Sequence, residues 1–234
     1  MKPMPTRANR PHIIGHRGAQ GLAPENTLKS FQTATDLGAD GVEFDVQRSA
    51  DGQLVIFHDD TVDRTTNGTG VLRLMTFDAI RQLDAGDGEQ VPTLDEVLDL
   101  FRTNDLILHV ELKDCFLFPD IEQQVIERIR AFGMVERCQL RSFEHDALHR
   151  AYAIAPEIAY SELWFAQIPV TPFFKTVNAY HSLYTAENLR QLHEQGVKAT
   201  AWTVNEIETA QHLLDIGIDG LTTDYPDRLL PLIS

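Results

Sequence analysis

The chain has 234 residues, of which 43% are hydrophobic and 24% charged, a composition that suits one barrel or two small globular domains. Its formal net charge of −15 argues against a nucleic-acid partner and against docking on an anionic membrane, because both are bound through an excess of Lys and Arg. A small anionic substrate stays compatible, because a bound cation can reverse the local field.

The sequence predicts a cytoplasmic protein without stable membrane insertion. No apolar stretch approaches the ~18 residues that a membrane-spanning helix needs. The basic segment 1–11 lacks the apolar core of a signal peptide, so we expect a short leader instead. Cys115 and Cys138 are expected to be buried free thiols in a reducing compartment, although sequence alone leaves a bridge between them open. The oligomeric state is not predicted.

Short β-rich runs alternate with amphipathic segments along nearly the whole chain. Helical periodicity lies between most of the runs, for example at 26–37, 121–132, 186–195 and 207–216. This alternation predicts an α/β fold, a parallel (β/α)₈ TIM barrel formed by residues 1–234 as a single domain. An open doubly wound sheet is the alternative, but no Gly-rich dinucleotide loop follows the first run. The eight expected strands are His12–His16, Gly41–Val46, Leu106–Lys113, Gln139–Phe143, Ile158–Glu162, Val177–His181, Lys198–Val204 and Gly220–Asp224.

A β-hairpin is expected directly after the second strand, where the chain leaves no room for a helix. The Asp-Gly dipeptide at 51–52 is a signal for a two-residue turn. Such a turn would place Phe57 opposite Val46 and His58 opposite Asp45. The hairpin would therefore return His58 to the level of the carboxylates on the second strand.

Two further segments depart from regular alternation. Residues 60–105 are long for a connection in a barrel and contain helical patterns at Thr76–Leu83 and Thr93–Phe101, so we expect a small insertion over the barrel mouth and not an independent domain.

Residues 163–174 are apolar and interrupted by proline. They could line a pocket for the alcohol part of a substrate or touch lipid, but a short helix in the outer ring is favoured because aromatic residues usually bury.

Carboxylates converge at the ends of the second and third expected barrel strands, where the functional side chains of such barrels lie. Glu43 and Asp45 are two residues apart and share one face of a strand, and Glu111 and Lys113 repeat that spacing. A solvated strand end explains a single acid, but it is a poor explanation for two matched pairs. Converging carboxylates repel one another unless a cation joins them, and oxygen ligands suit Mg²⁺ or Ca²⁺ better than zinc.

Two histidines at the same level are the candidates for proton transfer. His16 ends the first strand and His58 ends the hairpin. Phosphodiester cleavage needs one proton removed from the nucleophile and one delivered to the leaving oxygen, and histidine can do both near neutral pH. A lone histidine is more often a structural residue. His181 could contact substrate, and His109 has no assigned role.

Three more residues are expected at the pocket. Arg17 and Lys113 can hold phosphate oxygens and offset charge in the transition state. Lys113 could instead form the Schiff base of an aldolase or lyase, but its acidic neighbours favour the charged ammonium, which is a poor nucleophile. Trp202 either forms a wall of the pocket or belongs to the barrel core.

Short motifs follow one another in a fixed order from about residue 12 to Pro226. The motifs are Gly15-His-Arg-Gly18, Pro24-Glu-Asn-Thr27, Glu43-Phe-Asp-Val46, Asp51-Gly52, His58-Asp59, Asp63-Arg-Thr-Thr-Asn-Gly-Thr-Gly70, Pro92-Thr-Leu94, Glu111-Leu-Lys113, Ser142-Phe143 and Trp202-Thr-Val-Asn205. Each is weak alone, but the ordered set is specific, and it resembles the opening signature and later motifs of the glycerophosphodiester phosphodiesterase family.

The resemblance implies a TIM barrel with a small insertion after the hairpin. It implies metal-dependent hydrolysis of glycerophosphodiesters, such as glycerophosphocholine, to sn-glycerol 3-phosphate and an alcohol, a reaction of lipid and glycerol metabolism. The preferred alcohol stays open. The implied roles are general acid and base for His16 and His58, ligands of Mg²⁺ or Ca²⁺ for Glu43, Asp45 and Glu111, phosphate contacts for Arg17 and Lys113, and support or substrate contacts for Glu25 and Asn26.

A mechanism follows as a hypothesis. The cation bridges the phosphate and the neighbouring glycerol hydroxyl and lowers the pKa of that hydroxyl. One histidine removes its proton, the other protonates the leaving alcohol, and water then opens a cyclic phosphate. Two other functions stay open: a lipid phosphodiesterase of the phospholipase C or D type on the same barrel, and a metabolite-binding protein without catalysis.

Overall fold

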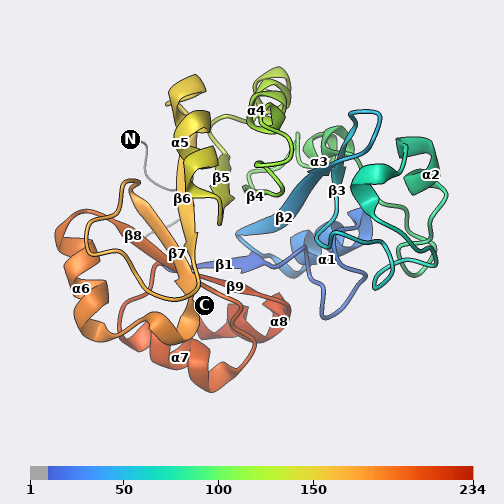
Figure 1. Ribbon diagram of the computed structural model, residues 1–234. Coiled ribbons are helices and arrows are strands. Elements are labelled where there is room, and N and C mark those ends of the chain that lie inside the picture. The colour runs from blue at the N-terminus through green and yellow to red at the C-terminus, as the bar shows by residue number, and fades with distance from the viewer. Residues whose placement is uncertain (1–9, 234) are drawn as a thin grey trace.

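Eight parallel strands close into a barrel in the computed structural model, which describes residues 10–233. Strand β1 (His12–Gly15) pairs with β2 (Gly41–Arg48) on one side and with β9 (Gly220–Thr223) on the other, which closes the ring. The predicted (β/α)₈ TIM barrel is therefore confirmed (Figure 1). The remaining barrel strands are β4 (Ile107–Leu112), β5 (Cys138–Ser142), β6 (Ala159–Trp164), β7 (Thr176–Tyr180) and β8 (Lys198–Trp202).

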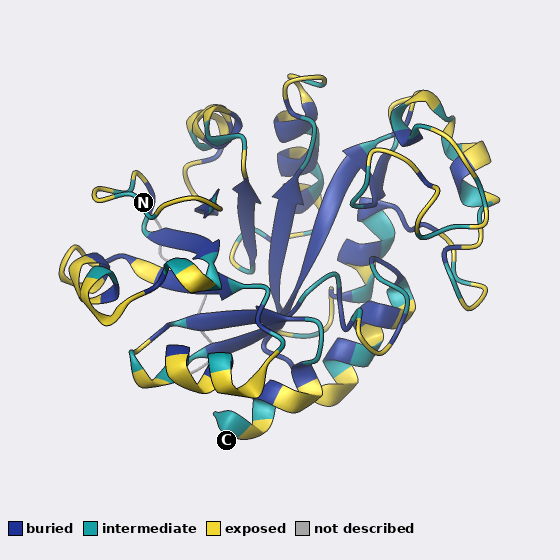
Figure 2. Ribbon diagram, turned by 60° about the horizontal axis from the view of Figure 1, so that its bottom comes forward, coloured by how far each residue is buried: buried dark blue, intermediate teal, exposed yellow. Residues whose placement is uncertain are grey.

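Helices surround the strands and turn exposed faces outward, while the strands are almost wholly buried (Figure 2). Helix α1 shows why the sequence starts and stops them: the Thr27 hydroxyl caps its N-terminus, and Gly38 ends it with φ +88°. No helix within residues 10–233 is long and apolar enough to cross a bilayer. The outer helices are α1 (Leu28–Leu37), α4 (Ile121–Ala131), α5 (His145–Ile154), α6 (Ala186–Glu194), α7 (Ile207–Asp215) and α8 (Pro226–Leu229).

Strand β3 (Leu54–Ile56) runs antiparallel to the end of β2 and forms the expected hairpin. The predicted register is wrong by one residue, because Phe57, and not His58, lies opposite Asp45 and donates its N–H to the Asp45 carbonyl at 3.0 Å. The turn has three residues instead of two, with Gly52 in the left-handed region at φ +93°, the usual geometry of a three-residue hairpin loop. His58 therefore follows the strand instead of belonging to it.

The insertion at residues 60–105 contains the short helices η1 (Leu72–Leu74), α2 (Phe77–Arg81) and α3 (Leu94–Leu100). The expected position over the barrel mouth is wrong. Its first part packs beside the barrel against β3, around a small apolar cluster that includes Val62, Leu72 and Ile80, and α2 lies outside the ring of strands (Figure 1). Helix α3 packs instead with the main core of the barrel. None of the residues that line the main pocket comes from the insertion.

The helix favoured for residues 163–174 is not formed. The chain leaves β6 as an irregular loop as far as β7. Pro169 and Pro172 explain this, since proline lacks the N–H that a helix interior requires. Phe174 still packs into the core with 2% exposure, whereas Phe165 is 64% exposed. The loop therefore offers apolar surface beside the barrel mouth.

The predicted state of the cysteines is confirmed: Cys115 and Cys138 are buried free thiols. Burial raises the pKa of Cys138 to about 12, so its thiol stays protonated near neutral pH. The leader expected at 1–11 lies almost wholly outside the described residues.

Candidate active site

Three carboxylates meet at the carboxyl ends of β2 and β4. Asp45 and Glu111 occupy paired positions of the two strands, and Glu43 shares the inward face of β2 with Asp45. One oxygen of each carboxylate lies within 4.8 Å of the other two, and none of the three residues is more than 9% exposed. The structure thus brings together all the residues that the sequence proposed as metal ligands.

The pKa values of the three carboxylates are shifted by burial and by their mutual repulsion. Burial and the charge of Asp45 raise the pKa of Glu43 to about 7, and the same causes raise the pKa of Glu111. Burial acts on Asp45 in the same direction, but Lys113 and Arg17 outweigh it and lower the pKa of Asp45. The raised pKa values of Glu43 and Glu111 mean that the three buried carboxylates repel one another when all are ionised. A hard divalent cation among their oxygens would relieve this repulsion.

His16 stands between the triad and the last strand of the barrel. Its Nδ1 lies 2.7 Å from Asp224 Oδ1, and its Nε2 lies 3.9 Å from Glu43 Oε2. Because an ionised carboxylate only accepts hydrogen bonds, Nδ1 donates to Asp224 and Nε2 is left toward the pocket. Burial lowers the pKa of His16, but the hydrogen bond with Asp224 and the charge of Glu43 outweigh it and raise the pKa above its usual value.

His58 is held by a second carboxylate. Its Nδ1 lies 2.6 Å from Asp59 Oδ1. Arg64 binds Asp59 through Nε at 2.6 Å and Glu25 through Nη1 at 2.6 Å, and it strongly lowers the pKa of Asp59. Arg64 belongs to the insertion, which therefore contributes to the site by holding His58 and not by covering the pocket. His58 and His16 line the same pocket.

The two expected phosphate-binding cations lie beside the triad. The backbone N–H of Arg17, at φ +48°, donates to Glu43 Oε2 at 3.0 Å. Lys113 Nζ lies 3.2 Å from Glu111 Oε1 and 3.9 Å from Asp45 Oδ1. Burial lowers the pKa of Lys113, but these two carboxylates outweigh it and raise the pKa. Lys113 is thus a charged ammonium, which disfavours the Schiff-base alternative.

Glu25 and Asn26 take supporting positions. The Arg17 guanidinium donates to Glu25 Oε1 at 2.6 Å. Asn26, with φ +56°, donates from Nδ2 to Asp45 Oδ2 at 2.9 Å and is buried. Neither Glu25 nor Asn26 lines the pocket. Of the two alternatives that the sequence left open for them, support and substrate contact, the geometry favours support.

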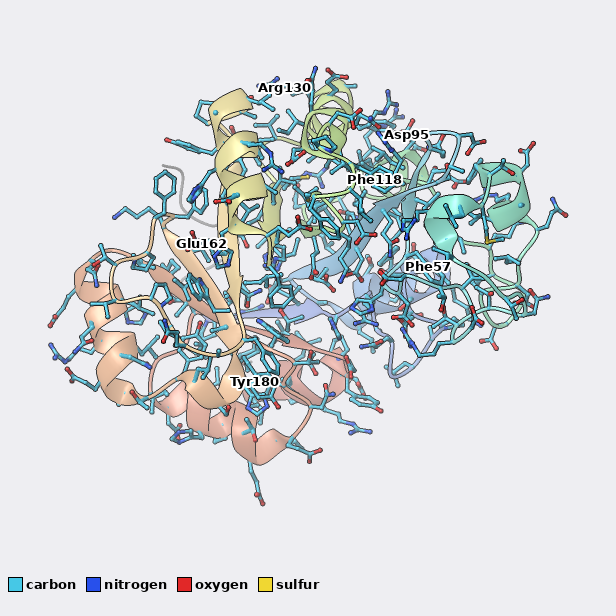
Figure 3. All side chains as sticks on the ribbon, in the orientation of Figure 1. Phe57, Asp95, Phe118, Arg130, Glu162 and Tyr180 are labelled. Carbon is cyan, nitrogen blue, oxygen red and sulfur yellow. The ribbon has the colours of Figure 1, made fainter. Side chains whose placement is uncertain are left out.

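A pocket of about 480 Å³ opens at this end of the barrel. One side carries the histidines and carboxylates. The rest of the lining mixes polar side chains with two aromatic rings, those of Trp202 at the end of β8 and Phe143 after β5, whose centroids lie 5.5 Å apart. Trp202 is therefore a wall of the pocket and not plain core. Figure 3 shows Tyr180 at the end of β7, where its ring lies 5.7 Å from that of Trp202. His181, the other candidate substrate contact, does not line this pocket.

Sequence reasoning missed three residues of the site: Asp224, Arg64 and Arg141. Arg141 lines the pocket from β5 with 1% exposure, and its register partner on β4 is Glu111. Burial lowers the pKa of Arg141 to about 10, although Glu43 and Glu111 oppose this. The available signal was the strand alternation: Gln139 and Arg141 share one face of β5, and the apolar Cys138 and Leu140 share the other.

Comparison with known proteins identifies relatives over nearly the whole chain. The model of the glycerophosphoryl diester phosphodiesterase family matches residues 16–228. A glycerophosphodiester phosphodiesterase of Caldanaerobacter subterraneus subsp. tengcongensis is 37% identical to the chain, over 94% of this chain and 97% of that protein.

Solved structures agree with the sequence relatives. The phosphodiesterase of Oleispira antarctica, in complex with its product sn-glycerol 3-phosphate, superimposes with a TM-score of 0.83 and 30% identity, over 95% of this chain and 96% of that one. The glycerophosphodiester phosphodiesterase of Agrobacterium tumefaciens gives a TM-score of 0.82 at 28% identity, over 94% and 99% of the two chains.

Proposed function

The chain belongs to the glycerophosphoryl diester phosphodiesterase family, and from that premise we propose that it hydrolyses glycerophosphodiesters to sn-glycerol 3-phosphate and an alcohol. One observation supports the proposal above the others. Two histidines, each hydrogen-bonded through Nδ1 to an aspartate, line one pocket beside three buried carboxylates. Such a pair can accept one proton and deliver another across a phosphodiester.

The proposed work of the histidines is proton transfer. The aspartate on Nδ1 fixes each ring and leaves Nε2 to exchange the proton. One histidine takes the proton of the glycerol hydroxyl next to the phosphate, and the other protonates the oxygen of the leaving alcohol. The roles reverse when water opens the cyclic phosphate. Both histidines line the pocket together with the three carboxylates, which supports this assignment.

Glu43, Asp45 and Glu111 would hold the divalent cation, Mg²⁺ or Ca²⁺, for which their buried oxygens are suited. When bound, such an ion lowers the pKa of a coordinated hydroxyl and offsets phosphate charge. Arg17 and Lys113 would hold phosphate oxygens, and their positive charge beside the same carboxylates supports this role. Arg17 lines the pocket, and Lys113 does not.

The decisive experiment is release of sn-glycerol 3-phosphate from a panel of soluble glycerophosphodiesters, with chelator and then with added Mg²⁺ or Ca²⁺. We expect chelator to stop release and metal to restore it. Release that continues in excess chelator would refute the metal dependence. No release with either ion, together with cleavage of phospholipid in liposomes, would refute the proposal in favour of the lipid phosphodiesterase alternative.

A further inference from the structure

Arg141 brings a buried positive charge to the pocket that the two histidines line. It continues a row across three neighbouring strands, in which Asp45 pairs in register with Glu111, and Glu111 pairs with Arg141. The side chain is 1% exposed. Burial lowers the pKa of Arg141 to about 10, which still leaves the guanidinium charged near neutral pH. A permanent cation therefore lies at the level of the carboxylates that would hold the metal.

The guanidinium of Arg141 is held by two uncharged side-chain amides. Its Nη2 donates to Gln139 Oε1 at 2.9 Å. Its Nη1 donates to the Asn178 amide oxygen at 2.7 Å when the Asn178 nitrogen donates to the Thr200 carbonyl at 3.0 Å. Within residues 10–233 the guanidinium forms no ion pair with a carboxylate, and its Nε has no hydrogen-bond partner. A buried charge without a countercharge is costly, and an anionic ligand in the pocket would supply one.

Thr222 brings a second unpartnered polar atom to the same pocket. It lines the pocket from β9 with 1% exposure, and its Oγ1 has no hydrogen-bond partner among the described residues 10–233. Strands β9 and β5 lie on opposite sides of the ring, because β8, β7 and β6 separate them one way and β1, β2 and β4 the other. Since a buried hydroxyl without a hydrogen bond is also costly, a ligand in the pocket would satisfy Thr222 as well as Arg141.

The other cations beside the triad already have carboxylate partners. The Arg17 guanidinium donates to Glu25 Oε1 at 2.6 Å. Lys113 Nζ lies 3.2 Å from Glu111 Oε1, and Lys113 does not line the pocket. Among residues 10–233, Arg141 is therefore the lining residue whose permanent charge is left for a ligand. A guanidinium N–H forms its stronger, charge-assisted hydrogen bonds with anionic oxygens.

We propose that Arg141, together with the Thr222 hydroxyl, binds phosphate oxygens of the substrate and of the product. The inference deepens the proposed function and rests on it, because it takes the glycerophosphodiester as the anion that enters the pocket. A fixed cation at this position also stabilises the negative charge that develops on the phosphate during attack. The product is the sharper probe, because a phosphate monoester carries more negative charge at pH 7 than a diester.

The first test measures binding of sn-glycerol 3-phosphate by calorimetry, with Mg²⁺ or Ca²⁺ supplied. Arg141→Met removes the charge-assisted hydrogen bond, so Kd should rise about 10–100-fold. Arg130→Met is the matched control: it removes the arginine of an exposed ion pair with Glu157, away from the pocket, and should leave Kd unchanged. An unchanged Kd in Arg141→Met would overturn the inference and leave the proposed function standing. A wild-type protein that neither binds sn-glycerol 3-phosphate nor releases it from a diester would refute both.

The second test separates ligand binding from a structural role. Thr222→Val keeps the shape of the side chain and removes only the hydroxyl. Because that hydroxyl has no partner in the fold, the free energy of unfolding should not fall, whereas Kd for sn-glycerol 3-phosphate should rise about fivefold. Thr176 is the matched control, since its Oγ1 is also buried and unpartnered but it does not line the pocket. The same Kd in Thr222→Val as in Thr176→Val would overturn the role of Thr222.

The third test shows whether Arg141 acts on the phosphate directly or through the metal site. A cation near the carboxylates opposes metal binding, so Arg141→Met should bind Mg²⁺ alone at least as tightly as the wild type. Weaker binding of Mg²⁺ alone in this variant would overturn direct contact with phosphate. Arg141→Lys keeps the charge and should give a Kd for sn-glycerol 3-phosphate between those of the wild type and Arg141→Met. If Arg141→Met fails to fold, Arg141→Lys and Thr222→Val still decide, because a wild-type Kd in both would overturn the inference.

Discussion

The two halves of the barrel mouth hold their side chains in different ways. At the ends of β1, β2 and β4, carboxylates, histidines and cations are fixed by hydrogen bonds and ion pairs, as between His16 and Asp224. At the ends of β5 to β8, aromatic rings such as Phe143, Phe165 and Trp202 touch one another at the rim. In the charged half, the loss of one group leaves its partner uncompensated. In the aromatic half, an exposed ring can be lost with little consequence for its neighbours.

The largest effect is expected in the charged half, at the histidines. His16→Ala or His58→Ala removes a group that transfers a proton, so kcat should fall by about 10²–10⁴. Metal binding, measured by calorimetry, should change little. His149→Ala, an exposed histidine on α5, is the matched control and should keep its activity. Wild-type turnover in either site variant would remove that histidine from the mechanism.

The next effect concerns a residue that supports the triad without lining the pocket. Asn26 fixes Asp45 through a 2.9 Å hydrogen bond, and loss of such a contact typically costs about 10–100-fold in metal affinity or activity. Asn26→Ala should show this loss in a metal titration of activity. Asn188→Ala, in the capping box of α6, changes the same residue type away from the site and should show none. Unchanged metal affinity in Asn26→Ala would mean that Asp45 needs no such support.

A smaller effect tests the link between His16 and Asp224. The hydrogen bond with Asp224 raises the pKa of His16, so Asp224→Asn should lower that pKa. Less of the imidazole is then protonated at a given pH, and the limb of the pH–rate profile that His16 sets should move to lower pH. A displacement of one pH unit corresponds to about a tenfold change in activity on that limb. A profile with unmoved limbs would show that Asp224 does not act through His16.

The smallest effect is expected in the aromatic half. Phe165 is 64% exposed, so Phe165→Ala should change the free energy of unfolding by no more than about 0.5 kcal/mol. Phe174, on the same loop but 2% exposed, provides the contrast: Phe174→Ala should cost about 3–5 kcal/mol. Chemical denaturation of both variants measures the difference. Equal costs would show that the rim rings are as firmly packed as the core.

Local patterns were enough for the strands and for the triad. Strand β2 was recognised by its β-forming residues Val42, Phe44 and Val46, which alternate with polar ones. The two-residue spacing of Glu43 and Asp45 placed both on one face. The hairpin register was missed because an Asp-Gly pair serves a three-residue turn as well as a two-residue one, with the glycine left-handed in either. The helix expected at 163–174 does not form, because the prediction gave the apolar composition more weight than the two prolines of the segment.

The sequence by itself determined the alternation of strands and helices, the acids that share a strand face and the two histidines, because these follow from periodicity within a few residues. Only the tertiary structure decided that Asp224 lies beside His16, 208 residues earlier, and that Arg64 joins Asp59 to Glu25. Closure of the barrel puts its first and last strands, β1 and β9, side by side. Arg64 of the insertion contacts Glu25 in the loop between β1 and α1. Contacts of this kind depend on how distant segments pack, which no local pattern encodes.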